Sequence, residues 1–392
     1  MLNICIPVWG EQYCKQWLRW SLPTLLAAHN LPSVSEFCET RVVVVTTRHS
    51  EILIRQSEVF HQLAQVCEVS MSFIEEPPNA YSGMTNAGVT VMRESIKTRG
   101  LYVLSLADQV WANGALLWVV RELTKSRGVL SWGALLDRDV FLERTSEFVL
   151  GNSLTIEPRF MASVAISTPH VVQRNWVIED DLIPRTPSSL IWVNESGTNA
   201  VVRSHILIAH GLNFRLIPQE KAECYMKSLS AGRVNDDAST YDLLFDDISQ
   251  FKVARSSDEV ITGSLDSSER QSLNQSRIRC TSDSRDAVLR KHLQAHQNWE
   301  PKLGRFFFGL EYVVVTNPDD SWLAATISTS YDLAMRVSIL GKRRKFVPAI
   351  WLRLSYQTRR RLIRLMKTGR VFGPLTKILI GYSLSNRKSF SS

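Results

Sequence analysis

Short apolar runs alternate with longer amphipathic stretches over the first 135 residues of this 392-residue chain. The unbroken run 42–45, four valines, is typical of a strand that is covered on both faces of a sheet. The apolar runs predict strands over 2–7, 41–47, 69–74, 101–106 and 129–135, and the stretches between them predict helices over 13–28, 51–66, 85–97 and 113–125. This alternation predicts an α/β fold, with a mostly parallel sheet and helices on both of its faces.

The alternation weakens after residue 136, where turn-forming residues become more frequent. We predict a helix over 158–166, a turn-rich stretch over 179–189, a short strand over 190–193 and a helix over 199–210. The stretch 235–284 is rich in Ser and Asp, which favours loops and short elements around the open side of the sheet.

Three of the predicted strands are followed by residues suited to binding a nucleotide. The first leads into Pro7-Val8-Trp9-Gly10-Glu11, where Pro and Gly turn the chain and the indole is suited to stacking on a base. The second leads into Thr46-Thr47-Arg48, with hydroxyls and a cation for a ribose or a diphosphate. The fourth leads into Asp108, a carboxylate suited to a divalent cation. Each group alone is also typical of an ordinary turn or N-cap, but ligands of parallel sheets bind at the carboxyl ends of strands, so the joint placement predicts a nucleotide site.

Several short motifs lie in this same region. They are Ile6 to Glu11 followed by Ser21-Leu22, then Asn86-Ala87-Gly88, Gly100-Leu101-Tyr102 and Leu106-Ala107-Asp108. Together they resemble the pattern of the GT-A glycosyltransferases, in particular bacterial enzymes of family 2 type that build cell-surface polysaccharides. The resemblance covers about residues 1–135, a third of the chain. It implies a GT-A-like core in which the two loops and Asn86 hold a nucleotide-sugar donor and Asp108 ligates Mg or Mn.

The sequence departs from that family pattern at two positions. Only Asp108 stands where the family has two aspartates, with Leu106 before it and Val110 after it. Thr46 and Thr47 stand where the family has an Asp that binds uracil. The nucleotide of the donor therefore stays open, and Arg48 or another cation is suited to share the phosphate charge.

Three clusters in the second part of the chain carry groups for an acceptor. Glu179-Asp180-Asp181 resembles the family's Glu-Asp pair, which implies Asp180 as the base that deprotonates the acceptor hydroxyl, although a solvated acidic turn is the alternative. His205 and His210 lie on the predicted helix, where His210 either faces the cleft from the helix end or belongs to a cap or the core. Glu259 follows a strand-like run over 251–254 and either returns a carboxylate to the site or belongs to a surface turn.

Charge is distributed unevenly along the chain, and this changes the picture at its C-terminal end. Residues 333–392 carry 15 of the 46 Lys and Arg and no acid, whereas residues 1–332 have a net charge of −7. The segment 349–367 mixes Trp, Leu and Ile with bases, which favours binding to an anionic membrane surface. A basic helix packed on the acidic body is the alternative, and nucleic acid is disfavoured because the body is acidic and has no nucleic-acid motif.

Other classes of protein are excluded by what the sequence lacks. There is no GxSxG, P-loop, GxGxxG or HExxH signature, and the six cysteines form no CxxC pair, so free thiols are expected. The N-terminus lacks a basic segment before its apolar run, and no apolar run is long enough to span a bilayer, so we expect a cytoplasmic protein.

These observations predict a glycosyltransferase that moves a sugar from a nucleotide-sugar donor to a saccharide or lipid-linked acceptor, peripherally at the inner face of the membrane. Residues 1–135 would form the nucleotide-sugar-binding half, 136–332 the acceptor-binding half, and 333–392 a basic amphipathic tail. The alternative is a non-catalytic, membrane-associated assembly protein with a degenerate glycosyltransferase fold, which the single carboxylate at the metal position favours. A sugar nucleotidyltransferase is a weaker alternative, because residues 7–11 lack the Gly-rich, basic loop of that class.

Overall fold

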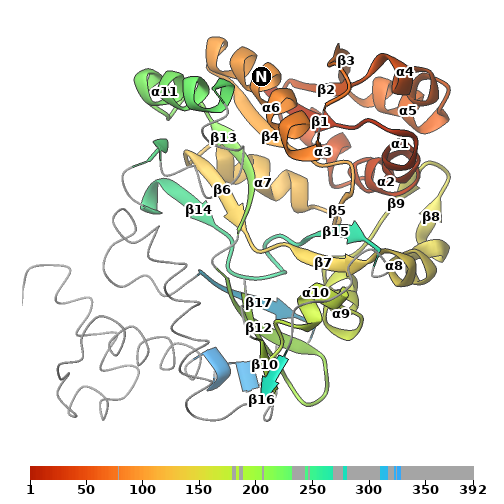
Figure 1. Ribbon diagram of the computed structural model, residues 1–392, viewed down its shortest axis with the longest axis vertical. Helices are drawn as coiled ribbons and strands as arrows, with labels where there is room; N and C mark the ends of the chain where they lie inside the picture. Colours follow the sequence, from red (N-terminus) through yellow and green to blue (C-terminus); the bar gives the residue numbers. More distant parts are fainter. Residues whose placement is uncertain are drawn as a thin grey trace, which may run out of the picture. The chain divides into compact units, whose positions relative to one another are not determined.

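The computed structural model describes residues 1–77, 79–178, 182–184, 189–204, 207–231, 243–245, 248–267, 277–279, 310–316, 322–323 and 325–327 (Figure 1). All of them belong to one compact unit, Met1–Ser330. Asp180, His205 and the basic segment 333–392 lie outside the described residues. Within the described part of the chain, we find no helix with the length and apolarity that crossing a membrane requires.

A seven-stranded sheet forms the centre of this unit, and the predicted α/β fold is confirmed. The strands lie in the order β14-β6-β13-β4-β1-β2-β3, and every neighbouring pair is parallel except the two pairs that involve β13. Their bounds are β1 Leu2–Pro7, β2 Thr40–Thr46, β3 Glu68–Phe73, β4 Leu101–Leu104, β6 Gly128–Ser131, β13 Ile208–Asn213 and β14 Phe251–Val253.

Helices cover both faces of the sheet, because successive strand residues point to opposite faces and both sets are apolar. Ile4 and Val44 belong to one buried cluster, while their neighbours Cys5 and Val45 belong to the other. Helices on the first face are α1 Glu11–Gln16, α2 Leu22–Leu25, α3 Leu31–Phe37, α4 Arg48–Arg55, α5 Glu58–Val66 and α7 Ala115–Leu123. Those on the second face are α6 Ala80–Lys97 and α11 Gln219–Ser230 (Figure 1).

Two helices that were predicted as single elements are divided in the structure. The stretch predicted over 13–28 consists of α1, a π-helical segment Trp17–Ser21, and α2, which begins with Pro23 in its first turn. The stretch predicted over 51–66 consists of α4 and α5, with Ser57 between them at the N-cap of α5. Helical backbone continues from Glu11 to Leu25, and Pro23, which has no N–H to donate, lies just after the π-helical turn. Ser57 has an extended backbone, which separates α4 from α5.

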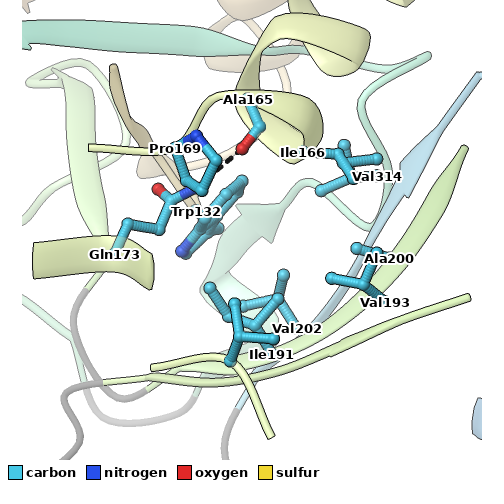
Figure 2. Close-up of a pocket in the computed structure, with 11 residues that line it drawn as sticks. Trp132, Ala165, Ile166, Pro169, Gln173, Ile191, Val193, Ala200, Val202 and Val314 are labelled. Atoms are coloured by element: carbon cyan, nitrogen blue, oxygen red, sulfur yellow. Dashed lines mark hydrogen bonds between the residues drawn. The ribbon is translucent and has the colours of Figure 1, made fainter. Parts of the chain in front are cut away.

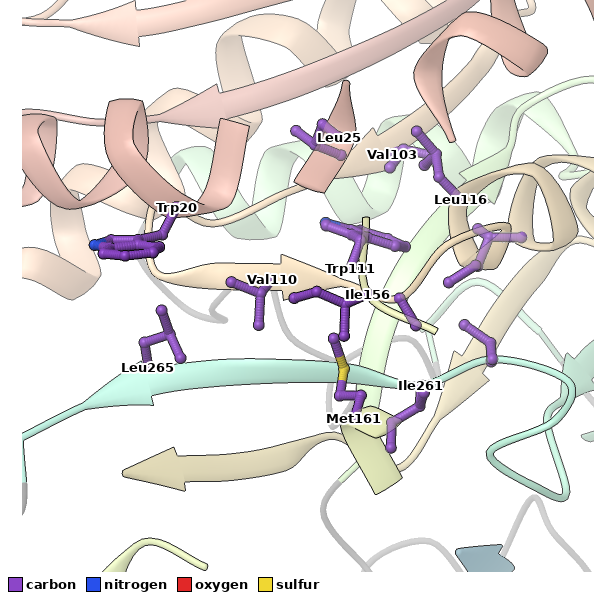
Figure 3. Packing of buried hydrophobic residues seen from close by; sticks show 14 of the residues in the cluster. Trp20, Leu25, Val103, Val110, Trp111, Leu116, Ile156, Met161, Ile261 and Leu265 are labelled. Atoms are coloured by element: carbon purple, nitrogen blue, oxygen red, sulfur yellow. The ribbon is translucent and has the colours of Figure 1, made fainter. Parts of the chain in front are cut away.

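The second part of the chain extends the core below the central sheet. Its helices are α8 Arg138–Thr145, α9 Pro158–Ser167 and α10 Val171–Arg174. One three-stranded sheet consists of β5 Gln109–Trp111, β15 Thr262–Asp266 and β7 Ala134–Asp137, and another consists of β11 Ser189–Val193, β12 Asn199–Ser204 and β17 Leu310–Val315. Two further sheets are strand pairs: β8 Val149–Leu150 with β9 Ser153–Leu154, and β10 Leu182–Pro184 with β16 Arg277–Arg279. Figure 3 shows Val110 and Trp111 of β5 between Leu25 on one side and Met161 and Leu265 on the other. One continuous core therefore joins the sheet to the elements of the second part.

The helix predicted over 199–210 is wrong: these residues contribute to β12 and β13. Val201 and Val202 are β-branched and fully buried, and β12 pairs on both sides with β11 and β17. Tertiary pairing decided this segment, since its apolar residues also fit a helical period.

The strand predicted over 129–135 is also divided, into β6 and β7. Gly133 lies at the break, and a Cβ there would be only 1.8 Å from Cδ1 of Ile208. The Ile208 side chain therefore fills the space next to Gly133, and it would have to move if this residue had a side chain.

Candidate functional site

The carboxyl ends of β1, β2 and β4 meet at one edge of the sheet, because these strands are parallel neighbours. Backbone hydrogen bonds continue past the strand ends: Val8 N–H donates to Val45 O at 2.9 Å, and Ser105 N–H donates to Cys5 O at 3.0 Å. The loops that the sequence singled out therefore lie side by side. This is the edge at which ligands of parallel α/β sheets bind.

The loop after β1 presents open backbone at this edge. Pro7 ends the strand, and Gly10 adopts φ +78°, a conformation that favours glycine. No atom lies within 4 Å of the position of a Cβ on Gly10, so a ligand can approach the backbone closely. Glu11 begins α1, is exposed, and pairs with Lys15, which lowers the pKa of Glu11.

Trp9 lies across the beginning of α6. A Cβ on Gly83 would be 2.4 Å from Cζ2 of Trp9 and 2.8 Å from Cγ of Pro77, so the indole uses the space that Gly83 leaves free. Trp9 is only partly buried, which leaves part of the ring accessible. Asn86, on the same helix, is exposed.

At the end of β2 the two threonines are enclosed, and Arg48 is exposed. Thr46 is fully buried, and Thr47 is buried as the N-cap of α4, where its side chain accepts from Ser50 N–H at 3.4 Å. Arg48 projects into solvent, with its guanidinium 3.5 Å from the centre of the Phe73 ring and hydrogen-bonded to Glu51 at 3.1 Å. The stacking and the ion pair hold this cation in place at the carboxyl ends of β2 and β3.

Asp108 lies in the turn between β4 and β5, four residues beyond the end of β4, so the predicted strand extends too far. Its carbonyl accepts from Leu265 N–H at 2.9 Å, which places Asp266 of β15 beside it. Burial, and then the charge of Asp266, raise the pKa of Asp108 to about 6. The fold therefore brings together two carboxylates that are far apart in the sequence.

The acceptor-side residues have separate outcomes. His210 lies in β13, not at a helix end, and its ring is fully buried, so the prediction that it faces the cleft is wrong. Its Nε2 is 2.6 Å from Ser131 Oγ, and the centres of the His210 and Trp111 rings are 5.2 Å apart. Burial lowers the pKa of His210 to about 3. An imidazole this enclosed cannot contact an acceptor hydroxyl.

Glu259 follows β14 and turns back on its own loop. Its carboxylate accepts from Arg255 N–H and lies 3.2 Å from Lys252 Nζ. These contacts are those of the surface turn that the sequence left open. Asp180 and His205 lie outside the described residues, so their roles stay predictions.

Sequence reasoning missed two residues at this edge, Asp266 and Ser50. Asp266 is the last residue of β15, but nothing in the sequence indicates that this strand pairs with β5 and β7 rather than with a neighbour along the chain. Ser50 looks like an ordinary residue in the first turn of a helix, and only the structure shows that Gly10 N–H donates to its Oγ at 3.0 Å.

A small crevice lies away from these loops, among α9, α10 and the sheet β11-β12-β17. Figure 2 shows the Trp132 indole between Pro169 and Gln173 on one side and Ile191 and Val202 on the other, with Gln173 donating to Ala165 O at 3.1 Å. None of its eleven lining residues is charged or nucleophilic. We therefore interpret it as an imperfection of packing and not as a reactive site.

Comparison with known proteins adds a distant resemblance. No protein-family profile and no curated protein matches the chain. Among solved structures, the chain is similar to S. aureus TarS 1-349 in complex with UDP (TM-score 0.31, 9% identity, 86% of this chain and 80% of that chain). It is also similar to the mannosyltransferase PcManGT from Pyrobaculum calidifontis in complex with GDP-Man and Mn2+ (TM-score 0.32, 12% identity, 100% and 88%), and to an apo UDP-glucose pyrophosphorylase (TM-score 0.30, 10% identity, 76% and 98%). Similarity this low does not indicate a function for this chain.

Proposed function

We propose that this protein is a glycosyltransferase that uses a nucleotide-sugar donor. The observation that carries the proposal is the grouping, at one sheet edge, of the open Gly10 loop, the exposed Arg48 cation and the Asp108–Asp266 carboxylate pair. A nucleoside diphosphate needs a backbone that can be approached closely, a cation for its phosphates and a flat surface for its base. Gly10, Arg48 and the accessible part of Trp9 supply these three features.

We propose that Asp108 and Asp266 hold a divalent cation together with the phosphates of the donor. Mg is usually held by one or two carboxylates together with substrate phosphates, and the oxygen donors of Asp108 and Asp266 provide such a set. Among the described residues there is no group of three or more His, Cys, Asp or Glu that would hold a metal without the substrate. When bound, Mg or Mn would neutralise the charge that develops on the departing diphosphate. Asp266 provides the second carboxylate that the sequence pattern lacks, which weakens the case for a degenerate, non-catalytic fold.

The reaction would transfer the sugar to a saccharide or lipid-linked acceptor in surface polysaccharide synthesis. A base is required because a hydroxyl is a poor nucleophile at neutral pH, and Asp180 remains the residue we propose for it. We also propose that the protein works at the cytoplasmic face of the membrane, with the bases of 333–392 on anionic lipids.

A binding screen tests this proposal directly. UDP-, GDP-, TDP- and CMP-linked sugars are titrated into the protein by calorimetry, with and without Mn2+, and release of the nucleotide is then followed with saccharide acceptors. We expect one nucleotide class to bind with Mn2+ and to lose affinity in Asp108→Asn and Asp266→Asn. Asp139→Asn is the matched control, since Asp139 is an exposed carboxylate whose side chain pairs with neighbouring Arg138. Binding without any turnover would favour the assembly protein, and no binding of any nucleotide would refute the proposal.

A further inference from the structure

Ser50 connects the two loops at which the nucleotide is proposed to bind. It lies in the first turn of α4 and is almost completely buried. Its Oγ accepts from Gly10 N–H at 3.0 Å, in the loop after β1, and from Thr47 Oγ1 at 3.2 Å, in the loop after β2. Burial raises the pKa of the nearby Cys14 thiol of α1, and the Ser50 hydroxyl partly offsets this effect.

The two hydrogen bonds use both acceptor positions of the side chain. A serine hydroxyl accepts at two lone pairs, and Gly10 N–H and Thr47 Oγ1 donate to them. Within the described part of the chain Gly10 N–H has no other side-chain partner, so removing the hydroxyl would leave this backbone group without its partner.

The hydrogen bond from Gly10 N–H to Ser50 matters for a ligand because Gly10 lies in the open loop after β1. Its backbone is in the left-handed region, and the space above its Cα is open. A glycine loop whose N–H has no hydrogen-bond partner samples many conformations. A ligand that binds only one of these conformations binds more weakly, because part of the binding free energy is used to order the loop.

We propose that Ser50 is a positioning residue for the nucleotide site, which sets the loop after β1 against the loop after β2 before the donor arrives. This inference rests on the proposed function, since it assigns Ser50 a role toward the same donor. Ser50 does not contact the donor itself; it acts through Gly10 and Thr47. Its loss should therefore affect donor affinity more than it affects stability.

The test compares Ser50→Ala with Ser95→Ala, because the two serines are closely matched. Ser95 is also buried in a helix that packs against the sheet, and its Oγ accepts from Asn3 Nδ2 of β1 at 2.9 Å, but at the opposite end of that strand. Calorimetric titration with UDP, GDP, TDP and CMP, each with Mn2+, measures affinity, and thermal melting measures stability. We expect both variants to melt at similarly lowered temperatures. Ser50→Ala should weaken nucleotide binding about tenfold, equivalent to about 1.4 kcal/mol, and Ser95→Ala less than twofold.

Each outcome of this comparison supports or overturns the inference. Equal affinities of Ser50→Ala and the unmodified protein would overturn the positioning role while leaving the proposed function intact. Equal losses in the Ser50 and Ser95 variants would also overturn it, by showing a general effect of lowered stability. If the unmodified protein binds none of the four nucleotides, the inference falls together with the proposed function. Should Ser50→Ala fail to fold, Ser50→Cys replaces the oxygen with a weak acceptor of similar size and must still weaken binding.

Discussion

Asp108 is a carboxylate that the fold holds in an unfavourable environment. Burial opposes its ionisation and Asp266 adds a like charge, which together raise the pKa of Asp108 to about 6 from an ordinary value of 3.8. Between these pH values the folded state binds more protons than the unfolded state, so the group makes the protein less stable as pH rises through that window. Such a cost is typical of residues retained for function rather than for folding.

We therefore expect Asp108→Asn to stabilise the protein while it abolishes its function. The gain should be at most about 3 kcal/mol at pH 7 and should vanish below about pH 4, where Asp108 is protonated in both states. Chemical denaturation at pH 4, 5, 6 and 7 measures the difference, with Asp139→Asn as the control. In the same samples, Mn2+ together with the nucleotide should raise the melting temperature of the unmodified protein and of Asp139→Asn, but not that of Asp108→Asn. A difference in stability that does not change with pH would contradict this account of Asp108.

Helix α6 influences the proposed nucleotide site because Gly83, in its first part, has no side chain. The 18-residue helix begins at an N-cap, Asn79, whose Oδ1 accepts from Ser82 N–H at 2.9 Å, so its first turn is held firmly. Trp9 rests on that turn because Gly83 has no Cβ. The orientation of the indole toward a nucleotide base therefore depends on a residue in a different element.

Gly83→Ala tests this dependence. The new Cβ would lie 2.4 Å from the indole, so the ring must move, and we expect about 1–3 kcal/mol of destabilisation and several-fold weaker nucleotide binding. The two effects are measured by denaturation and by calorimetric titration, for Gly83→Ala and Trp9→Ala singly and together. If the contact carries the effect, Gly83→Ala should change little once Trp9 is absent. Additive losses would show that Gly83 matters for another reason.

In the whole molecule, the sign of the net charge differs between two parts of the chain. Residues 1–332 have a net charge of −7, whereas residues 333–392 carry 15 bases and no acid. Near an anionic membrane each base contributes about 1 kcal/mol, and salt screens this attraction within about 8 Å at physiological ionic strength. The proposal of a membrane location therefore depends on this one segment.

Removal of residues 333–392 should release the protein from membranes. We expect the full chain to float with anionic liposomes at low salt and to dissociate partly at high salt, whereas the truncated protein stays in the soluble fraction and still binds its nucleotide. Neutral liposomes are the control for lipid charge. Equal partitioning of both proteins, or binding that ignores lipid charge, would refute the membrane role of this segment.

The sequence by itself determined the elements whose residues leave little choice. The valine run of β2 can be buried only in a strand with both faces covered, and β1 ends where Pro7 and Gly10 turn the chain. Because these strands are parallel neighbours, their carboxyl ends had to meet, so Trp9, Arg48 and the region of Asp108 could be placed at one edge from sequence alone.

Only the tertiary structure decided the remainder, because it depends on pairings between distant segments. The segment 199–210 fits a helical period, but β4, β6, β11 and β17 offer it sheet partners. The pairing of β13 buries His210 against Trp111 and Ser131. The separate pairing of β15 with β5 and β7 brings Asp266 beside Asp108. The local sequence pattern shows which face of an element is apolar, but it does not show which distant strand will pack against that face. The charge and the hydrogen bonding of the site depend on which strand does so.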